Sequence, residues 1–323
     1  MDMMPGDGTL GSLLGDMKLG DMAAGGAKLA DARPGDVMGR IERALYAAVG
    51  RADVPGCPPG LAEAMRHSVF PRGARIRPRL CLAVAAACGE DRPALTDAAA
   101  ASIELLHCAS LVHDDLPCFD DAATRRGRPT VHRAYGEPLA VLAGDALIVL
   151  AFQTLAHGAA TAPERLGALV LTVARSVGVP FGIVAGQAWE CEAAADLSLY
   201  QQEKTGALFA AATVAGAAAA GAEHEPWRAV GMKLGEAFQV ADDILDAAGD
   251  AARIGKPVGR DAALGRPSAV RRHGLNGAID LLEDLAAQAV AAVPDCPGAG
   301  PLRSHILSET RRLLPAELAR HAA

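Results

Sequence analysis

The stretch IELLHCASLVHDDLPCFD, residues 103–120, decides the fold, because it is an apolar helical segment that ends in carboxylates. The apolar spacing predicts a helix over residues 93–116, and a proline at its start suits the first helical turn. Asp114 and Asp120 would point to different sides of a continuous helix. Pro117 should end the helix and fold the chain back, so that both carboxylates can reach one ion.

A second acidic cluster ends another apolar segment, for which a helix is predicted over residues 226–248. Asp242 and Asp246 lie one turn apart on one face, where like charges repel. A cation would remove this repulsion, and Mg²⁺ prefers oxygen ligands and completes its shell with water and phosphate. Six aspartates at the ends of two long helices therefore predict a magnesium site between helices that face one another.

The composition favours helices. The chain has 323 residues, of which 51% are hydrophobic and only 3% aromatic, and it is rich in alanine and glycine. We predict an all-α fold, a single large helical bundle around a central cavity, over residues 35–323, after a flexible tail over residues 1–34. Further helices are predicted over residues 36–49, 61–68, 77–88, 138–157, 163–177, 180–192 and 197–221, with a helical pair at the C-terminus.

The charge pattern restricts the ligands. A net charge of -7 and a pI near 5.7 argue against attraction of the whole protein to nucleic acid or to anionic membranes. Anions must therefore meet local basic groups, and carboxylates, arginines and an apolar cavity together indicate a diphosphate on an apolar tail. These groups are Arg72, Arg75, Arg77 and Arg79; Arg125, Arg126 and Arg128; and Lys204 with Lys256.

The cysteines and the apolar runs indicate the cellular compartment of the protein and whether it spans a membrane. The seven cysteines have no paired or metal-like spacing and their number is odd, so we expect reduced thiols in the cytoplasm. The longest uncharged apolar run, residues 205–222, is mostly alanine and glycine. We expect a tightly packed buried helix there and no membrane span.

Five motifs, in order along residues 36–320, resemble those of the trans-isoprenyl diphosphate synthase (polyprenyl synthetase) family. LHCASLVHDDLPCFD (106–120), followed by Arg-Arg-Gly (125–127), is similar to its first aspartate-rich motif. GEAFQVADDILD (235–246), followed by Gly-Lys (255–256), is similar to the second. The smaller matches are Arg-Ile-Arg-Pro (75–78), Gly-Gln (186–187) and Lys-Thr (204–205).

The resemblance is strongest to bacterial carotenoid-pathway geranylgeranyl diphosphate synthases. It implies a magnesium-dependent prenyltransferase, usually a homodimer, with three ions when diphosphate is bound. The enzyme would condense isopentenyl diphosphate with dimethylallyl, geranyl or farnesyl diphosphate by ionisation, condensation and elimination. Nucleic acid and membrane are not implied as partners.

The resemblance also implies a role for each matched residue. The metal ligands would be Asp114, Asp120 and Asp242, with Asp115, Asp243 and Asp246 binding directly or through water. The allylic diphosphate would be held by Arg125, Lys204 and Lys256. Isopentenyl diphosphate would be held by Arg77, His107 and Arg126, while Thr205 and Gln239 would line the reacting region.

Two positions depart from the family pattern. The family commonly has a lysine where this chain has Ala74, so one contact to isopentenyl diphosphate is missing. We expect Arg72 or Arg75 to replace it. Glu190 stands where an aspartate is usual, which is a milder change.

Product length is expected to depend on the helix below the first motif. Family members that stop at fifteen carbons commonly carry an aromatic residue five positions before the first aspartate, and here that residue is Ala109, followed by Ser110. Five helical residues separate Ala109 from Asp114 by about 7.5 Å. The small side chain leaves room for a twenty-carbon product, geranylgeranyl diphosphate.

Other classes stay open at this level. A farnesyl diphosphate synthase would differ in product length, and a non-catalytic subunit would typically lose aspartates that this chain keeps. A terpene cyclase lacks a second diphosphate site, so Arg77, Arg126 and His107 argue against it. A di-iron bundle would need Glu-x-x-His pairs, which do not occur. The preferred allylic primer and the pathway served are not specified by the sequence.

Overall fold

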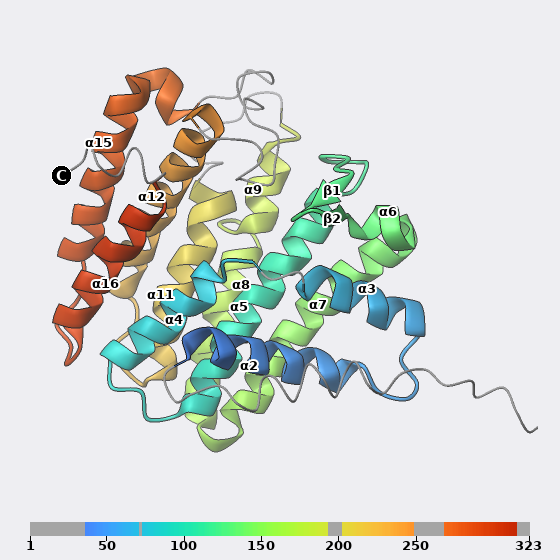
Figure 1. Ribbon diagram of the computed structural model, residues 1–323. Helices are drawn as coiled ribbons and strands as arrows, with labels where there is room; N and C mark the ends of the chain where they lie inside the picture. The colour runs from blue at the N-terminus through green and yellow to red at the C-terminus, as the bar shows by residue number, and fades with distance from the viewer. Residues whose placement is uncertain (1–35, 71–72, 193–201, 249–267, 315–323) are drawn as a thin grey trace, which may run out of the picture.

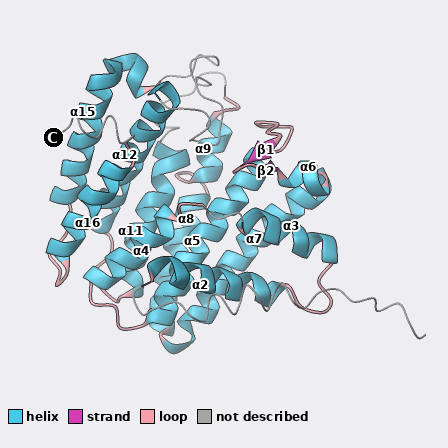
Figure 2. Cartoon of the chain, viewed as in Figure 1, coloured by secondary structure: helices cyan, strands magenta, loops and turns pink. Residues whose placement is uncertain are grey.

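The computed structural model describes residues 36–70, 73–192, 202–248 and 268–314, and these residues form helices and one two-stranded hairpin (Figure 2). The all-α prediction is confirmed. The predicted tail, Arg72 and Lys256 lie outside the described residues.

The helices run in chain order as follows. They are α2 (Val37–Ala52), α3 (Pro59–Val69), α4 (Ile76–Ala87), α5 (Pro93–Asp114), α6 (Val131–Tyr135), α7 (Glu137–Gly158), α8 (Leu166–Val177), α9 (Ile183–Trp189), α11 (Ala207–Ala219), α12 (Trp227–Ala248), α15 (Ala269–Ala291) and α16 (Ala299–Arg312). Two 3₁₀ turns, Ala159–Thr161 and Pro163–Arg165, precede α8, and a π-helical turn, η3 (Gln202–Gly206), precedes α11.

Helix α5 is central, and α2, α4, α7 and α11 pack around it (Figure 1). Most of its side chains are buried, which explains why its sequence is apolar on more than one face. Helices α12 and α15 pack on each other through a second apolar cluster that includes Ala237, Ile244 and Leu282. The C-terminal ends of α5 and α12, which carry the two acidic clusters, lie at the same end of the bundle (Figure 1).

Helix α11 shows why small residues dominate the chain. All residues from Leu208 to Ala219 are buried. A side chain at Gly216 would place its Cβ 2.4 Å from the carbonyl oxygen of Cys81 on α4. The apolar run over residues 205–222 thus contains a buried helix, as predicted. By length and composition two other segments could cross a membrane, Pro93–Asp114 and Glu137–Thr161, with 78% and 44% of their apolar windows buried inside the protein.

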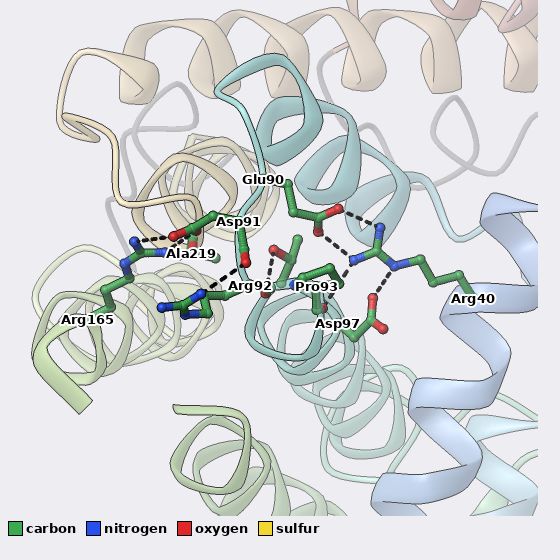
Figure 3. Close-up of polar contacts among 9 residues, drawn as sticks. Arg40, Glu90, Asp91, Arg92, Pro93, Asp97, Arg165 and Ala219 are labelled. Carbon is green, nitrogen blue, oxygen red and sulfur yellow. Dashed lines mark hydrogen bonds and ion pairs between the residues drawn. The ribbon is translucent and has the colours of Figure 1, made fainter. Parts of the chain in front are cut away.

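Ion pairs hold the opposite end of α5 (Figure 3). Arg40 of α2 donates to Glu90 at 3.0 Å and also pairs with Asp97 in the first turns of α5. Arg165 donates to Asp91 at 2.6 Å and to the last carbonyl of α11 at 2.8 Å. The loop between α4 and α5 is therefore fixed on both sides, which sets the position of α5 along the bundle.

Three local features were not predicted from the sequence. The stretch after the first acidic cluster contains strands β1 (Thr124–Arg125) and β2 (Arg128–Pro129) and the short α6. Helix α9 occupies only the middle of the predicted 180–192 helix. The described part of the predicted 197–221 helix begins with the π-helical turn η3.

Candidate functional site

The end of α5 folds back as predicted. The helix ends at Asp114, and the Asp120 amide donates to the Asp114 carbonyl at 3.0 Å. Asp115 is buried, and its carboxylate accepts from Nε of Arg125 on β1 at 3.1 Å. Burial alone would lower the pKa of Arg125, but the hydrogen bond and charge of Asp115 raise it, so this arginine stays charged. The fold-back thus fixes a cation beside the first acidic cluster.

The β1–β2 hairpin presents Arg126 from a tight turn. Arg126 and Gly127 both have positive φ, 52° and 74°, as a two-residue turn between twisted strands requires. The Arg126 guanidinium lies against Gly73, where a Cβ would come within 2.7 Å of Cζ. Any larger residue at Gly73 would displace this arginine from the start of α4.

Lys204 lies between the first acidic cluster and α9. Its Nζ is 3.8 Å from Asp114 Oδ1 and 2.9 Å from Glu190 Oε1. Gln187 donates to the other Glu190 oxygen at 2.8 Å. Gly186 lets α9 approach the turn η3, because a Cβ at Gly186 would be 2.7 Å from the Lys204 amide nitrogen. The Gly-Gln motif therefore positions Glu190, and Glu190 holds Lys204 beside Asp114.

Asp114 has an altered affinity for protons. Burial raises its pKa to about 6, with the nearby carboxylates of Asp120 and Glu190 acting in the same direction. Lys204 and Arg125 oppose this rise. The raised pKa of Asp114 thus reflects mainly the cost of burying its charge, which the nearby cations do not fully offset.

The turn η3 also reaches the second acidic cluster. Thr205 donates to the Gln239 side chain at 3.3 Å, and Gln239 donates to Asp243 at 3.1 Å. The second Asp243 oxygen accepts from the backbone amide of Ala269 at the start of α15, at 2.7 Å. Gly235 permits close packing of α12 against η3, because a Cβ at Gly235 would lie 2.7 Å from Cα of Gly206. Lys204 and Thr205 thus contact residues of both motifs from one turn of chain.

The remaining acids of the second motif lie on the same helix. Asp242 and Asp246 are half-buried on α12, whereas Asp243 is buried. Among the described residues, no three histidine, cysteine, aspartate or glutamate side chains are grouped as a ready metal site. The expected convergence of both motifs on one ion therefore stays a prediction.

Arg77 and His107 form a half-buried basic region with Arg126. The Arg77 guanidinium lies over the Phe209 ring, 4.7 Å from its centroid, and its Nε is buried with no hydrogen-bond partner among the described residues. Burial lowers the Arg77 pKa to about 10, with the charge of Arg126 acting in the same direction and the charge of Glu104 opposing it. Burial and the neighbouring arginines lower the pKa of His107 well below 6.5, so its imidazole is neutral at pH 7. The region has donors and positive charge suited to an anion.

Arg75 lies elsewhere than expected. It has a positive φ of 50°, and its side chain is 0% exposed. It donates to Glu42 at 3.0 Å, to Glu104 at 2.7 Å and to the carbonyl of Val69 at 2.7 Å. The expectation that Arg75 contacts substrate in place of a lysine at Ala74 disagrees with this placement, because its donors face protein acceptors.

Sequence reasoning also missed Glu42 and Glu104. Both are buried, on α2 and α5 respectively. The sequence did contain a signal for them, which is a carboxylate within an otherwise apolar stretch of helix. Glu104, for example, lies about one turn before His107.

The predicted chain-length residues lie on α5. Ala109 is 2% exposed and belongs to the main apolar core. Ser110 is half-buried, and its hydroxyl donates to the His107 carbonyl at 2.9 Å. A small pocket of about 30 Å³ adjoins α5 between α3 and the hairpin, and Cys108, Asp115 and Arg126 are among its lining residues.

A helical bundle with carboxylates, arginines and a lysine gathered at one end has the architecture of isoprenoid synthases. The chain belongs to the polyprenyl synthetase family, whose sequence model matches residues 58–295. It is thus a prenyltransferase, as the motifs predicted. It is 55% identical over 280 residues to a geranylgeranyl diphosphate synthase of Cereibacter sphaeroides, covering 87% of this chain and 97% of that protein. The corresponding Rhodobacter capsulatus protein is 53% identical over 263 residues, covering 81% and 91%.

Two solved structures show the same fold. An FPP/GFPP synthase from Zymomonas mobilis has a TM-score of 0.71 at 30% identity, covering 88% of this chain and 99% of that chain. A geranyltransferase from Helicobacter pylori, complexed with magnesium and isoprenyl diphosphate, has a TM-score of 0.71 at 28% identity, covering 87% and 99%.

Proposed function

We propose that the protein is a magnesium-dependent geranylgeranyl diphosphate synthase that joins isopentenyl diphosphate to allylic diphosphates. The observation that carries this proposal is the turn η3, because Lys204 contacts Asp114 of one motif and Thr205 contacts Gln239 of the other. The names of the two bacterial relatives, which match nearly the whole of their length, support the same activity.

The acidic residues suit magnesium by their chemistry. Their donors are carboxylate oxygens, and Asp114 has a raised pKa because burial and like charges disfavour its ionised form. A divalent cation would favour that ionised form. We propose Asp114, Asp120 and Asp242 as direct ligands and Asp115, Asp243 and Asp246 as further or water-mediated ligands, with three ions in the complete site. Bound magnesium would stabilise the negative charge of the departing diphosphate.

The cations would divide between two diphosphates. Arg125 and Lys204, beside the first acidic cluster, would hold the allylic diphosphate, and Lys256 is proposed to join them. Arg77 and Arg126 would hold isopentenyl diphosphate, with neutral His107 donating a hydrogen bond. An apolar surround protects the carbocation until the isopentenyl double bond attacks it, and the released diphosphate would accept the final proton.

The small side chain at Ala109 supports a twenty-carbon product. It lies on α5 about one helical turn after Leu105, which is also buried. A product chain directed along α5 meets alanine where members that make shorter products carry an aromatic ring. A farnesyl product is the alternative, and product analysis distinguishes the two.

We also propose a cytoplasmic homodimer. Helix α7 is apolar, yet it exposes Leu142 and Val149. A second copy of the chain would cover these side chains in an interface of about 800 Å² per partner.

The test is an assay of the purified protein with isopentenyl diphosphate and each allylic primer in turn. We expect magnesium-dependent turnover with a dominant twenty-carbon product, lost on chelation and restored by added Mg²⁺. A dominant fifteen-carbon product would assign the alternative. Absence of turnover from the purified homomer would instead favour a non-catalytic subunit.

A further inference from the structure

The β1–β2 hairpin has strands of two residues, which are too short to fix their own position, so contacts from outside decide where Arg125 and Arg126 lie. On the side of β1, Asp115 of α5 accepts from Arg125. At the base of the hairpin, the Thr130 amide donates to the carbonyl of Ala123 at 3.1 Å. Strand β2 is contacted from another helix, α3, which lies on the same side of the bundle (Figure 1).

His67 of α3 contacts β2 through both nitrogens of its ring. Nε2 lies 2.7 Å from the carbonyl oxygen of Pro129, and Nδ1 lies 3.0 Å from Nη2 of Arg128. A carbonyl oxygen accepts and a guanidinium donates, so Nε2 carries the proton and Nδ1 is the acceptor. The ring of Tyr135 on α6 packs edge-on against the imidazole, with the centroids 5.4 Å apart, and fixes its plane. A neutral histidine thus makes two hydrogen bonds to one short strand.

We propose that His67 is a positioning residue for isopentenyl diphosphate, because it fixes β2 and thereby the turn from which Arg126 projects. This inference rests on the proposed function, in which Arg126 binds that substrate. His67 acts through the hairpin and not by contact with the substrate.

The turn has little room to adjust to a change in His67. Arg126 and Gly127 connect β1 directly to β2, so a shift of β2 moves the turn. The Arg126 guanidinium lies against Gly73, where a Cβ would come within 2.7 Å of Cζ. Between α3 and the hairpin lies the small pocket of about 30 Å³, which has space for about one water molecule. A displacement of β2 therefore changes where the Arg126 guanidinium lies beside the start of α4.

The two proposed substrates should respond differently to loss of these hydrogen bonds. Arg125, which we propose for the allylic diphosphate, pairs with the buried carboxylate of Asp115. That pair comes from α5, and it stays in place when the contact from α3 is removed. Loss of His67 should therefore weaken the binding of isopentenyl diphosphate more than the binding of the allylic diphosphate.

His67→Phe tests the proposal, because phenylalanine keeps a ring beside Tyr135 but removes both hydrogen bonds to β2. The matched control is Ser68→Ala, since Ser68 lines the same pocket and donates to the Met65 carbonyl within α3. His67→Gln is the conservative variant, because its amide retains a donor for the Pro129 carbonyl. The measurements are kcat, KM for isopentenyl diphosphate, KM for farnesyl diphosphate and the melting temperature of each variant.

We expect His67→Phe to raise KM for isopentenyl diphosphate about tenfold, because a displaced guanidinium contacts the diphosphate less well. KM for farnesyl diphosphate should change less than about twofold, since Arg125 keeps its pair with Asp115. His67→Gln should raise KM for isopentenyl diphosphate by about threefold, because one of the two hydrogen bonds is restored. Ser68→Ala should leave both KM values unchanged.

Equal rises in both KM values, together with a lower melting temperature, would overturn the proposal, because they would show that His67 supports the fold as a whole. An unchanged KM for isopentenyl diphosphate in a folded His67→Phe enzyme would overturn it as well. If His67→Phe does not fold, His67→Gln decides, and an unchanged KM in that variant contradicts the inference. If the wild-type protein does not condense isopentenyl diphosphate at all, the proposed function fails. If it does and the His67 variants match it, only the role of His67 fails.

Discussion

The environment of Asp114 predicts that magnesium binding depends on pH. Its pKa in the folded protein is raised to about 6 from 3.8, first by burial and then by Asp120 and Glu190. Because the folded pKa is raised, stability from the protonated group is present at low pH and is lost as the pH rises from about 4 to about 6. A divalent cation binds the ionised carboxylate, so Mg²⁺ should raise the melting temperature more at about pH 8 than at about pH 5.

Differential scanning fluorimetry of the metal-free protein, with and without Mg²⁺, measures this difference. The control is Asp114→Asn, in which the effect of Mg²⁺ should be smaller and nearly independent of pH. Equal shifts of the wild-type protein at both pH values would contradict a role for this titration in metal binding.

Ala109 controls product length if the growing chain follows α5. Ala109→Phe should shift the main product from twenty to fifteen carbons, because the ring fills space in a position that is 2% exposed. The larger residue should also cost about 1–3 kcal/mol of stability through overpacking. Chromatography of the products from geranyl diphosphate provides the measurement.

Ala109→Val supplies a graded control, with a smaller loss of twenty-carbon product. A folded Ala109→Phe enzyme that still makes mainly the twenty-carbon product would place the end of the product chain elsewhere.

The roles of individual residues were harder to predict than their presence in motifs. The arginines of the Arg-Ile-Arg-Pro match were noted from the sequence, but Arg75 turns inward because its backbone adopts a positive φ of 50°. This left-handed conformation is unusual for a residue with a side chain, and nothing in the local sequence indicates it. By contrast, the fold-back at Pro117 was predictable, because proline restricts both itself and its neighbour.

At the scale of elements, glycine contacts position the turn that carries Lys204 and Thr205. Gly235→Ala would place a Cβ 2.7 Å from Cα of Gly206, so α12 or η3 must move. We expect a loss of about 2 kcal/mol in stability and at least a tenfold fall in kcat/KM, because the turn that carries Lys204 and Thr205 shifts.

Gly50→Ala is the matched control, since Gly50 lies within α2 and a Cβ there meets nothing within 4 Å. It should stabilise the protein by about 0.5–1 kcal/mol and leave activity unchanged. Chemical denaturation and steady-state kinetics of both variants provide the comparison. Full activity in Gly235→Ala would show that the turn tolerates displacement.

The long helices were predictable, but the short elements between them were not. Apolar runs of more than ten residues mark α5 and α7, apolar periodicity marks α12, and prolines or glycines mark their ends. The hairpin after α5 has strands of two residues, too short for an alternating pattern. Its turn uses Arg126 at a position where asparagine or aspartate would be the usual signal.

At the scale of the whole molecule, the sequence predicted which apolar helix is buried better than which apolar helix is exposed. The alanine-rich run that contains α11 was expected to be buried because it is uncharged and small, and it is. Helix α7 is also apolar, but only 44% of its most apolar window is buried. Apolar composition alone does not distinguish a helix buried within one chain from a helix buried between two chains.

This exposed face of α7 yields a prediction about assembly. Leu142 and Val149 are 51% and 56% exposed and lie two helical turns apart, so they share one face. Replacing both with glutamate should convert a dimer into monomers, because unpaired charges would be buried in the apolar interface.

Sedimentation velocity measures the change as a halving of the mass. The control is Leu307→Glu, at a position that is 38% exposed. Leu307 belongs to α16, which lies across the bundle from α7 (Figure 1), so this change should leave the mass unchanged. A wild-type protein that sediments as a monomer would remove the dimer from the proposal, whereas a double variant that remains dimeric would place the interface on another helix.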